Sequence, residues 1–383
     1  MIDLPNILQL QLSPGVLDLA WGHPDMKLLP VELVRRASDR ALSKYAGAML
    51  TYGIDRGVKP LRDAVQHWLA THEGAAPHDN ELMISAGNSH GLALVGAMYA
   101  QPGDVVFVEN PTYHLALRIL RDMPIQIRPI PCDEEGMLID ELAAQVSLCR
   151  VQNQRIAFIY MIPTCQNPTG VTLSAQRRAD LKQLVESNDL MVVEDDVYRE
   201  LWYTAPPLPP LWQTIARGQV IRLGSFAKSL APGLRIGYIT ASAPIIDRLS
   251  GCGLLDSGGG MAHYPGLMVA ELLESGDYAS IVSGYRTAYA QRRDALHNAL
   301  LPLQHHGYHW QLPTGGYFLW MRLPDGVVAA DALKKIRAEQ VDALPGTLFS
   351  QLPLSYQAVR FAFSLFDEAQ LTDAGQRVVR ALT

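Results

Sequence analysis

The chain has few cysteines, no long apolar run and no excess of positive charge. Its 383 residues include four cysteines, which stand far apart at Cys132, Cys149, Cys165 and Cys252. This spacing argues against a disulfide framework and against a zinc site, so we expect no metal and a reducing compartment. The longest apolar run, near residues 92–100, is too short to cross a membrane.

The charge balance and the first residues exclude further classes of protein. The formal net charge is −6, and no basic stripe or charged tail is visible. Nucleic acid and anionic membranes are therefore not expected as partners. Residues 1–5 show no basic segment followed by an apolar one, so no secretory signal is predicted. These features together predict a cytoplasmic protein.

Short apolar segments indicate the strands of a buried sheet. Between them lie helical patterns such as residues 90–99 and 174–187, where Ser174 is a plausible N-cap. Continuous apolar runs between helices suit a mainly parallel sheet that is covered on both faces. The segments are residues 105–108, 156–160, 190–193, 219–223 and 236–239.

The pattern changes beyond about residue 280. A long helical stretch at residues 278–301 leads into short strands near residues 316–322 and 358–363. This order is typical of a smaller α+β unit beside a large α/β unit. We therefore predict an α/β protein with a large domain at residues 46–280. Residues 1–45 and 281–383 would form the small domain.

Residues 225–237 carry the most informative pattern, because a lysine follows a predicted strand. Ser225 lies three residues before Lys228, and Arg235 lies seven residues after it. Both can reach one phosphate, since the intervening Pro-Gly pair bends the chain. A lysine that forms an imine must lose its proton easily, and burial or nearby cations lower the pKa of its ammonium. An ordinary surface lysine is the alternative interpretation.

This pattern resembles the fold-type I pyridoxal-5′-phosphate (PLP) aminotransferases, and the resemblance extends over about residues 19–382. The chain is similar to the subgroup that includes 2-aminoadipate and kynurenine aminotransferases and the catalytic half of the MocR regulators. The resemblance implies PLP as the cofactor, which Lys228 would hold as a Schiff base. It also implies that residues 46–280 bind PLP and that an N-terminal segment covers the active site.

Residues 194–198 follow a buried strand and carry two neighbouring acids. The resemblance assigns Asp195 to the pyridine nitrogen of PLP and Tyr198 to its O3′ oxygen. A carboxylate keeps the ring nitrogen protonated, and the ring then acts as an electron sink. Asp196 is the competing candidate, but family members place the acid three residues before the tyrosine. A solvated turn is the alternative interpretation of the two acids.

Three further residues complete the predicted substrate site. The resemblance places Asn167 on the cofactor O3′ and near the substrate, Tyr113 on the face of the pyridine ring, and Arg360 on the substrate α-carboxylate. Guanidinium suits bidentate carboxylate binding, and an arginine among apolar residues needs a partner. The alternatives are a simple turn at Asn167, a core aromatic at Tyr113 and an internal salt bridge at Arg360. Cys165 is interpreted as a bystander.

Residues 85–92 lie between a strand and a helix, where main-chain N–H groups bind phosphate well. Family members usually carry Gly-Ser-Gln-Gln here, whereas this chain has Asn88, Ser89 and His90. We assign phosphate anchoring to Asn88 and Ser89, together with the serine and arginine of residues 225–237. The resemblance also takes Tyr52 across a dimer to the partner's phosphate, which implies a homodimer with shared active sites.

Two segments depart from the family or carry unusual residues. In the N-terminal segment, Gly22 would let the main chain approach the substrate, and His23 is a candidate for substrate contact or proton transfer. A solvated loop histidine is the alternative. Residues 258–260 are three consecutive glycines, which predict a flexible main chain with room for a larger substrate. His263 is a candidate polar residue at the dimer interface.

The predicted activity is a ping-pong transfer of an amino group from an L-amino acid to a 2-oxo acid. Lys228 would act as general acid and base after the substrate displaces it. One alternative is another PLP reaction on the same scaffold, namely elimination, cyclisation or oxidation. A second alternative is a ligand-sensing protein of the MocR type, although the aminotransferase pattern begins within about twenty residues of the start.

Overall fold

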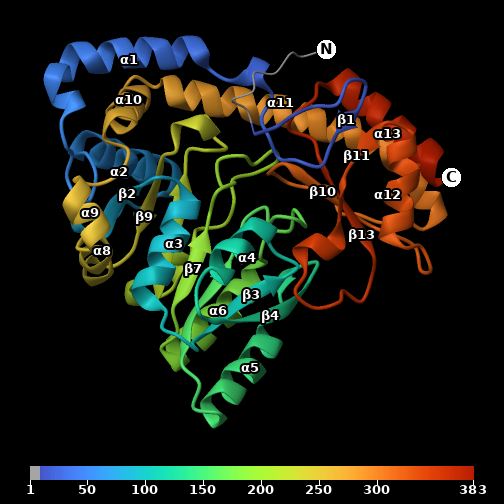
Figure 1. Cartoon of the computed structure of the whole chain (residues 1–383), viewed down its shortest axis with the longest axis horizontal. Helices are drawn as coiled ribbons and strands as arrows, with labels where there is room; N and C mark the ends of the chain where they lie inside the picture. Colours follow the sequence, from blue (N-terminus) through green and yellow to red (C-terminus); the bar gives the residue numbers. More distant parts are fainter. Residues whose placement is uncertain (1–8) are drawn as a thin grey trace.

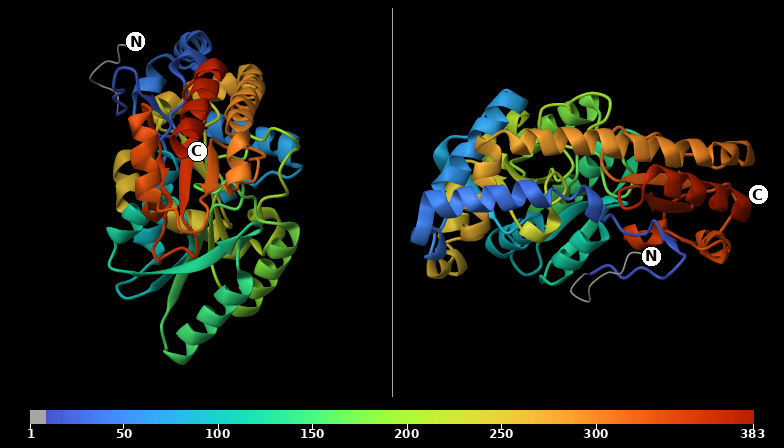
Figure 2. Two further views of the ribbon diagram at one scale, coloured as in Figure 1. Left: turned by 90° about the vertical axis from the view of Figure 1, so that its right-hand side faces the viewer. Right: turned by 90° about the horizontal axis from the view of Figure 1, so that it is seen from above.

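The computed structural model describes residues 9–383, so residues 1–5, where no secretory signal is expected, lie outside the described part. The strands form one large sheet and a smaller group beside it (Figure 1). A long helix, α11 (Asp277–Leu300), runs along both groups, and Figure 2 shows its full length from above.

The large sheet has eight strands in the order β2-β9-β8-β7-β6-β3-β4-β5. Neighbours from β8 to β4 pair in parallel, whereas β9 is antiparallel to both β2 and β8, and β5 is antiparallel to β4. The predicted α/β fold with a mainly parallel sheet is confirmed. The strands are β2 (Leu82–Ser85), β3 (Val105–Asn110), β4 (Gln126–Asp133), β5 (Gly136–Met137), β6 (Ile156–Met161), β7 (Val192–Asp195), β8 (Val220–Ser225) and β9 (Gly237–Thr240).

Alternation along the central strands builds two apolar layers. In β3, Val106 and Val108 pack with α3 and α4, whereas Val105 and Phe107 pack with α5 and α6 on the opposite face. Helices therefore cover both faces, which explains why these strands are apolar without interruption. The helices concerned are α3 (Asn88–Tyr99), α4 (His114–Arg121), α5 (Ile139–Val151), α6 (Ala175–Asn188), α7 (Leu211–Thr214), α8 (Ala243–Ser250) and α9 (Gly253–Gly258). Ser174 caps α6 as predicted, accepting a bond from the N–H of Arg177 at 3.2 Å.

The smaller group of strands holds the N-terminal stretch in place. The antiparallel order is β10-β13-β12, and a separate parallel pair joins β1 to β11. Helices α12 (Ala329–Ala338) and α13 (Glu368–Leu382) pack here, and α13 also packs on α11. The predicted domain boundaries stay a prediction. The strands are β1 (Leu17–Asp18), β10 (Phe318–Arg322), β11 (Val341–Asp342), β12 (Leu344–Pro345) and β13 (Ala358–Ala362).

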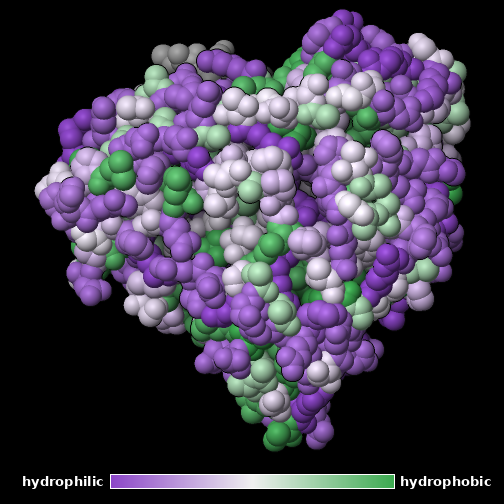
Figure 3. Space-filling view, turned by 180° about the vertical axis from the view of Figure 1, so that it is seen from behind, coloured by the Kyte–Doolittle hydropathy of each residue, from purple (hydrophilic) through white to green (hydrophobic). Residues whose placement is uncertain are grey.

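The remaining long helices form one group, in which one helix contacts the other two. They are α1 (Val31–Tyr45), α2 (Lys59–Glu73) and α10 (His263–Glu274). On the face drawn in Figure 3, hydrophilic residues predominate and apolar ones are interspersed. None of the helices within residues 9–383 combines the length and the apolar character that a bilayer crossing requires.

Candidate active site

The candidate site lies where the parallel strands of the large sheet end. Asp195 is the last residue of β7 and Ser225 is the last residue of β8, while Tyr160 lies near the end of the neighbouring strand β6. Ligands of open α/β sheets bind beyond the carboxyl ends of the strands. The fold therefore gathers at one edge residues that are far apart in sequence.

Lys228 lies in the turn after β8 and is half-buried. Its Nζ donates a hydrogen bond to the carbonyl of Gly22 at 2.8 Å and lies 5.3 Å from the ring centre of Tyr317. Burial, and then the charges of Arg360 and Arg235, lower the pKa of Lys228 to about 8. The neutral amine, which is the nucleophilic form, is thus accessible near neutral pH.

Asp195 is buried, and its carboxylate accepts two side-chain hydrogen bonds. Asn88 Nδ2 donates to Oδ1 at 2.6 Å, and the Tyr160 hydroxyl donates to Oδ2 at 2.8 Å. Burial raises the pKa of Asp195 to about 6, while the bonds from Asn88 and Tyr160 oppose the rise. At neutral pH the group is therefore predominantly a carboxylate.

Asp196 belongs to a different, purely structural cluster. Its carboxylate pairs with Arg222 at 2.9 Å and with Arg199 at 3.6 Å, and both arginines also pair with Glu73 at 2.6 and 2.9 Å. All four side chains are at least nine-tenths buried. Because Asp196 is already paired with arginines, the arrangement supports Asp195 as the acid for a pyridine nitrogen.

The start of α3 and Arg235 form a cradle for an anion. The helix begins at Asn88, and its N-terminal N–H groups have no side-chain cap. Gly87 has φ +84°, and a Cβ there would lie 2.9 Å from a guanidinium nitrogen of Arg235. Helix N–H groups and a guanidinium are the donors that a phosphate requires. The cradle fits the phosphate of PLP.

The side chains predicted to line this cradle differ in their burial and in their hydrogen-bond partners. Ser225 is half-buried and its Oγ accepts a bond from the N–H of Ala227 at 3.1 Å, while Ser89 is exposed on the first turn of α3. The Asn88 amide is directed to Asp195 and to the carbonyl of Leu223 at 2.9 Å. Asn88 therefore offers the cradle its main chain, and its amide lies on the acid instead.

Arg360 is buried on β13 with 2 % of its surface exposed. Its guanidinium donates to the amide oxygen of Asn167 at 2.8 Å and to the carbonyl of Ala20. The rings of Phe318 and Phe349 lie 4.0 and 4.6 Å from the guanidinium carbon. Both bonds run to neutral oxygens, so the arrangement does not support the internal salt bridge and leaves the cation for a substrate carboxylate. Asn167 and Arg360, predicted together, are in direct contact.

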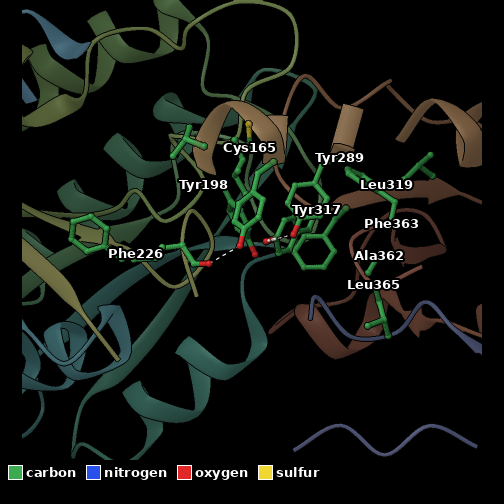
Figure 4. Packing of buried hydrophobic residues seen from close by; sticks show 14 of the residues in the cluster. Cys165, Tyr198, Phe226, Tyr289, Tyr317, Leu319, Ala362, Phe363 and Leu365 are labelled. Carbon is green, nitrogen blue, oxygen red and sulfur yellow. Dashed lines mark hydrogen bonds between the residues drawn. The ribbon is translucent and has the colours of Figure 1, made fainter. Parts of the chain in front are cut away.

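Aromatic rings pack together next to Tyr198. Tyr198 is buried and meets Tyr317 edge-on at 5.7 Å and Phe318 at 6.0 Å. Burial raises the pKa of Tyr113 to about 12, with the Asp195 charge acting in the same direction. Figure 4 shows Tyr198 and Tyr317 close together with Cys165 beside them. Burial raises the pKa of the Cys165 thiol to about 12, which suits a bystander.

The N-terminal stretch passes Lys228 and Phe318 at Gly22, and its role as an active-site segment stays a prediction. A Cβ on Gly22 would lie 2.6 Å from the ring of Phe318, so only glycine fits there without displacement. The carbonyl of His23 accepts a bond from the Ser364 hydroxyl at 2.7 Å. Burial, and then the charge of Lys228, lower the pKa of the His23 imidazole. His23 is thus half-buried beside the lysine rather than in a solvated loop.

Two of the three glycines at residues 258–260 pack on the loop that carries Tyr52. A Cβ would lie 2.7 Å from the carbonyl oxygen of Gly53 if added to Gly259, and 2.0 Å from that of Ile54 if added to Gly260. The prediction of open room is therefore wrong at these two positions, where the glycines permit close main-chain packing. His263 Nε2 lies 2.9 Å from the carbonyl oxygen of Ala48 in the same chain, and its interface role stays a prediction.

Sequence reasoning missed three residues at this site. Tyr160 was read only as part of an apolar strand, although a hydroxyl near the end of such a strand is a usable signal. Trp21 and His114 lie 6.4 Å apart, and His114 meets Phe349 edge-on at 5.0 Å, next to Arg360. Only their adjacency to Gly22 and Tyr113 in sequence could have indicated them. Among residues 9–383, no three His, Cys, Asp or Glu side chains cluster as metal ligands would.

Comparison with known proteins decides the family. Residues 10–378 match the family described as aminotransferase class I and II. The chain belongs to this family. It is 31 % identical to aromatic-amino-acid aminotransferase 1 of Thermococcus litoralis, over 99 % of this chain and 91 % of that protein. The class I and II aminotransferases are transaminases, and this chain accordingly is a PLP-dependent enzyme that moves amino groups between amino acids and oxo acids.

A solved structure and a regulator extend the comparison. The fold superimposes on kynurenine aminotransferase of Pyrococcus horikoshii, solved with PMP, with a TM-score of 0.90 and 32 % identity, over 96 % of this chain and 91 % of that one. A helix-turn-helix transcriptional regulator of Bacillus subtilis is 27 % identical over 95 % of this chain and 74 % of its own length. The resemblance to both aminotransferases and MocR-like regulators is thus confirmed.

Proposed function

We propose that this aminotransferase follows a ping-pong mechanism in which Lys228 and Arg360 address the two ends of one amino acid. The observation that carries the proposal is that both side chains contact the N-terminal stretch. Lys228 donates to the carbonyl of Gly22, and Arg360 donates to the carbonyl of Ala20. The amine-reactive group and the carboxylate-binding group therefore contact the same three-residue stretch. An α-amino acid presents an amine and a carboxylate on one carbon, so it offers a partner to each of the two groups.

The residues around this stretch divide the work of the reaction. When bound, PLP accepts the amino group and delocalises the negative charge that develops at the substrate Cα. Lys228, with its lowered pKa, takes the Cα proton and returns it as general acid. Asp195 keeps a proton on the ring nitrogen, and Tyr198 and Asn167 serve the O3′ oxygen. Arg360 and Asn167 orient the substrate carboxylate, and Tyr113 packs on the ring.

Phosphate anchoring falls to the start of α3 with Asn88 and Ser89, and to Ser225 and Arg235. These donors hold one end of the cofactor, so that only the substrate bonds at the other end change during the reaction. The cradle at Gly87, which a Cβ would fill, supports this assignment.

The aromatic rings near Arg360 support donors with aromatic or large apolar side chains. Trp21, His114 and Phe349 follow one another at ring distances of 6.4 and 5.0 Å, and Phe349 packs on the arginine. Aromatic side chains gain from offset or edge contacts with such rings. The names of the relatives, which concern aromatic amino acids and kynurenine, agree with this substrate class.

We also propose a homodimer in which Tyr52 completes the partner's phosphate site. Tyr52 is 85 % exposed, and Leu50 and Ile54 beside it are 73 % and 53 % exposed. A row of exposed apolar residues suits burial against another protein surface. The cytoplasmic location and the absence of nucleic acid and membrane partners stay predictions.

The proposed function is tested by trapping and by product analysis. Borohydride reduction of the holoenzyme should leave a pyridoxyl adduct on Lys228, which peptide mass spectrometry detects. With an aromatic donor, the purified enzyme should form the 2-oxo acid continuously only when an acceptor oxo acid is supplied. Sustained product formation without an acceptor would support elimination, cyclisation or oxidation instead. Absence of any turnover across an amino-acid panel would support a ligand-sensing role.

A further inference from the structure

Both oxygens of the Asp195 carboxylate are held by neutral donors from different elements. Asn88, the first residue of α3, donates to Oδ1 at 2.6 Å. Tyr160, on β6, donates to Oδ2 at 2.8 Å. The same Asn88 amide also donates to the carbonyl of Leu223 on β8 at 2.9 Å, so that its orientation is fixed by two bonds. The carboxylate therefore sits in a clamp formed by three elements.

The charge of the donors distinguishes Asp195 from its neighbour. Asp196 is neutralised by Arg222 at 2.9 Å and Arg199 at 3.6 Å. Among the described residues, the side-chain donors to Asp195 are an amide and a phenol, which stabilise a carboxylate without cancelling its charge. A buried carboxylate that keeps its charge is suited to a cationic partner, and a protonated pyridine nitrogen is one.

We propose that Asn88 is a positioning residue that acts through Asp195, keeping its carboxylate ionised and oriented toward the ring nitrogen of the cofactor. This inference rests on the proposed role of Asp195. It assigns to the Asn88 amide a task that differs from phosphate binding, which its main chain and Arg235 serve. Without the Asn88 bond, the carboxylate becomes more basic, and the shared proton moves from the ring nitrogen to Asp195.

The nitrogen chemical shift of ¹⁵N-labelled PLP in the holoenzyme tests this proposal directly, because it reports whether the ring nitrogen carries a proton. Asn88→Ser removes the amide and introduces the residue usual in the family. Tyr160→Phe removes the bond to the other oxygen and leaves the contact with Leu223 untouched. Asn188→Ser is the matched control, since its amide donates to the carbonyl of Leu184 within α6 at 2.7 Å.

We expect Asn88→Ser and Tyr160→Phe to move the nitrogen signal toward that of the unprotonated ring. The ratio of protonated to unprotonated nitrogen should fall roughly tenfold, the effect of one hydrogen bond to a charged group. Turnover should fall while KM for the donor changes little. Asn188→Ser should leave the signal unchanged. If Asn88→Ser does not fold, Asn88→Asp keeps its shape and places a second carboxylate beside Asp195, which should produce a shift in the same direction.

A fall in thermal stability of the Asn88 variant with an unmoved nitrogen signal would overturn the proposal, because it would show that Asn88 only fastens α3 to β8. An unmoved signal with unchanged stability would overturn it as well. The trapped adduct on Lys228 separates this outcome from a failure of the proposed function. Adduct formation in every variant keeps the aminotransferase chemistry intact whatever the nitrogen signal shows.

Discussion

At the residue scale, Arg360 combines deep burial with hydrogen bonds to neutral oxygens. Within residues 9–383 its guanidinium is held by Asn167, Ala20 and two phenyl rings, so a substrate carboxylate would supply an anionic partner. Lysine keeps the charge but cannot present two parallel donors. Arg360→Lys should lower kcat/KM for the amino-acid donor roughly 30- to 1000-fold, equivalent to about 2–4 kcal/mol.

Steady-state kinetics with one donor checks this expectation. Arg322→Lys is the matched control, because Arg322 lies on the adjacent strand β10 and packs on Tyr356 at 4.3 Å. The control should retain wild-type kcat/KM. Equal kinetics for the two variants would show that Arg360 is not the carboxylate-binding residue.

The lowered pKa of Lys228 predicts how the reactivity of its amine depends on pH. Burial and two arginines lower its pKa to about 8, so the ammonium should lose its proton well below the ordinary lysine value of 10.5. In the apoprotein, reductive methylation of Lys228, followed by mass spectrometry, should rise with pH and be half-maximal near pH 8. Arg360→Gln removes one of the two positive neighbours and should raise this midpoint.

The exposed Lys334 provides the reference peptide in the same digest. A Lys228 profile that coincides with the ordinary lysine value in both proteins would contradict the expected electrostatic effect. A midpoint near 8 that Arg360→Gln leaves in place would show that burial and Arg235, and not Arg360, lower the pKa of Lys228.

Some side chains of the site can be predicted from the sequence, and others cannot. Asp195 ends β7, and Lys228 and Arg235 come after β8, so the order of elements alone brings them to one edge. The contact between Asn88 and Asp195 depends on how α3 packs over β7 and β8, and 107 positions separate the two residues. No local pattern contains this information, which explains why the amide was assigned to the phosphate.

At the element scale, the glycine segment at residues 258–260 gives a matched pair of positions. Gly260 has φ +80° and a Cβ there would lie 2.0 Å from the carbonyl oxygen of Ile54, whereas Gly258 faces open space. Gly260→Ala should lower the free energy of unfolding by roughly 1–3 kcal/mol, because it combines backbone strain with a clash. Gly258→Ala should change it by less than about 0.5 kcal/mol.

Thermal unfolding of the two variants in parallel measures the difference. Equal unfolding temperatures would mean that residues 259–260 do not pack on the Tyr52 loop. The comparison is independent of catalysis, so it tests the packing of the glycine segment by itself.

Whether the sequence predicts a strand depends on how much of the strand's surface is buried. The five apolar runs all form strands, because burial on both faces leaves an uninterrupted sequence signal. Strand β4 is mostly half-buried, with Ile130 as its one fully buried position, and it contains two prolines, while β1, β11 and β12 have two residues each. Such short or edge strands take their conformation from tertiary pairing, so residues 126–133 were not predicted.

At the scale of the whole molecule, the shared active site of the proposed homodimer can be tested by complementation. Lys228→Ala and Tyr52→Ala should each abolish or strongly reduce activity in pure form. In a hybrid dimer, one site receives both defects and the other receives neither. Random exchange makes half of the dimers hybrids with one intact site of two, so mixing should restore about a quarter of wild-type activity.

The activity assay after co-refolding, with analytical ultracentrifugation of the same samples, checks the result. Two variants of the same subunit position, Lys228→Ala mixed with Lys228→Arg, form the control and should stay inactive. Dimers without restored activity would show that Tyr52 serves its own subunit, and monomers would contradict the proposed assembly.

The stretch at residues 20–22 links the two halves of the chemistry through consecutive peptide units. One carbonyl receives the cation that comes with the small sheet, and the carbonyl two positions later receives the amine that comes with the large sheet. Its length thus fixes the separation at which a ligand's two functional groups are received. An inserted or deleted residue here would change the distance between the two carbonyl groups, whereas substitutions at Trp21 and His23 change only the neighbouring side chains. Laboratory evolution toward new donors should therefore vary those side chains and conserve the length of the stretch.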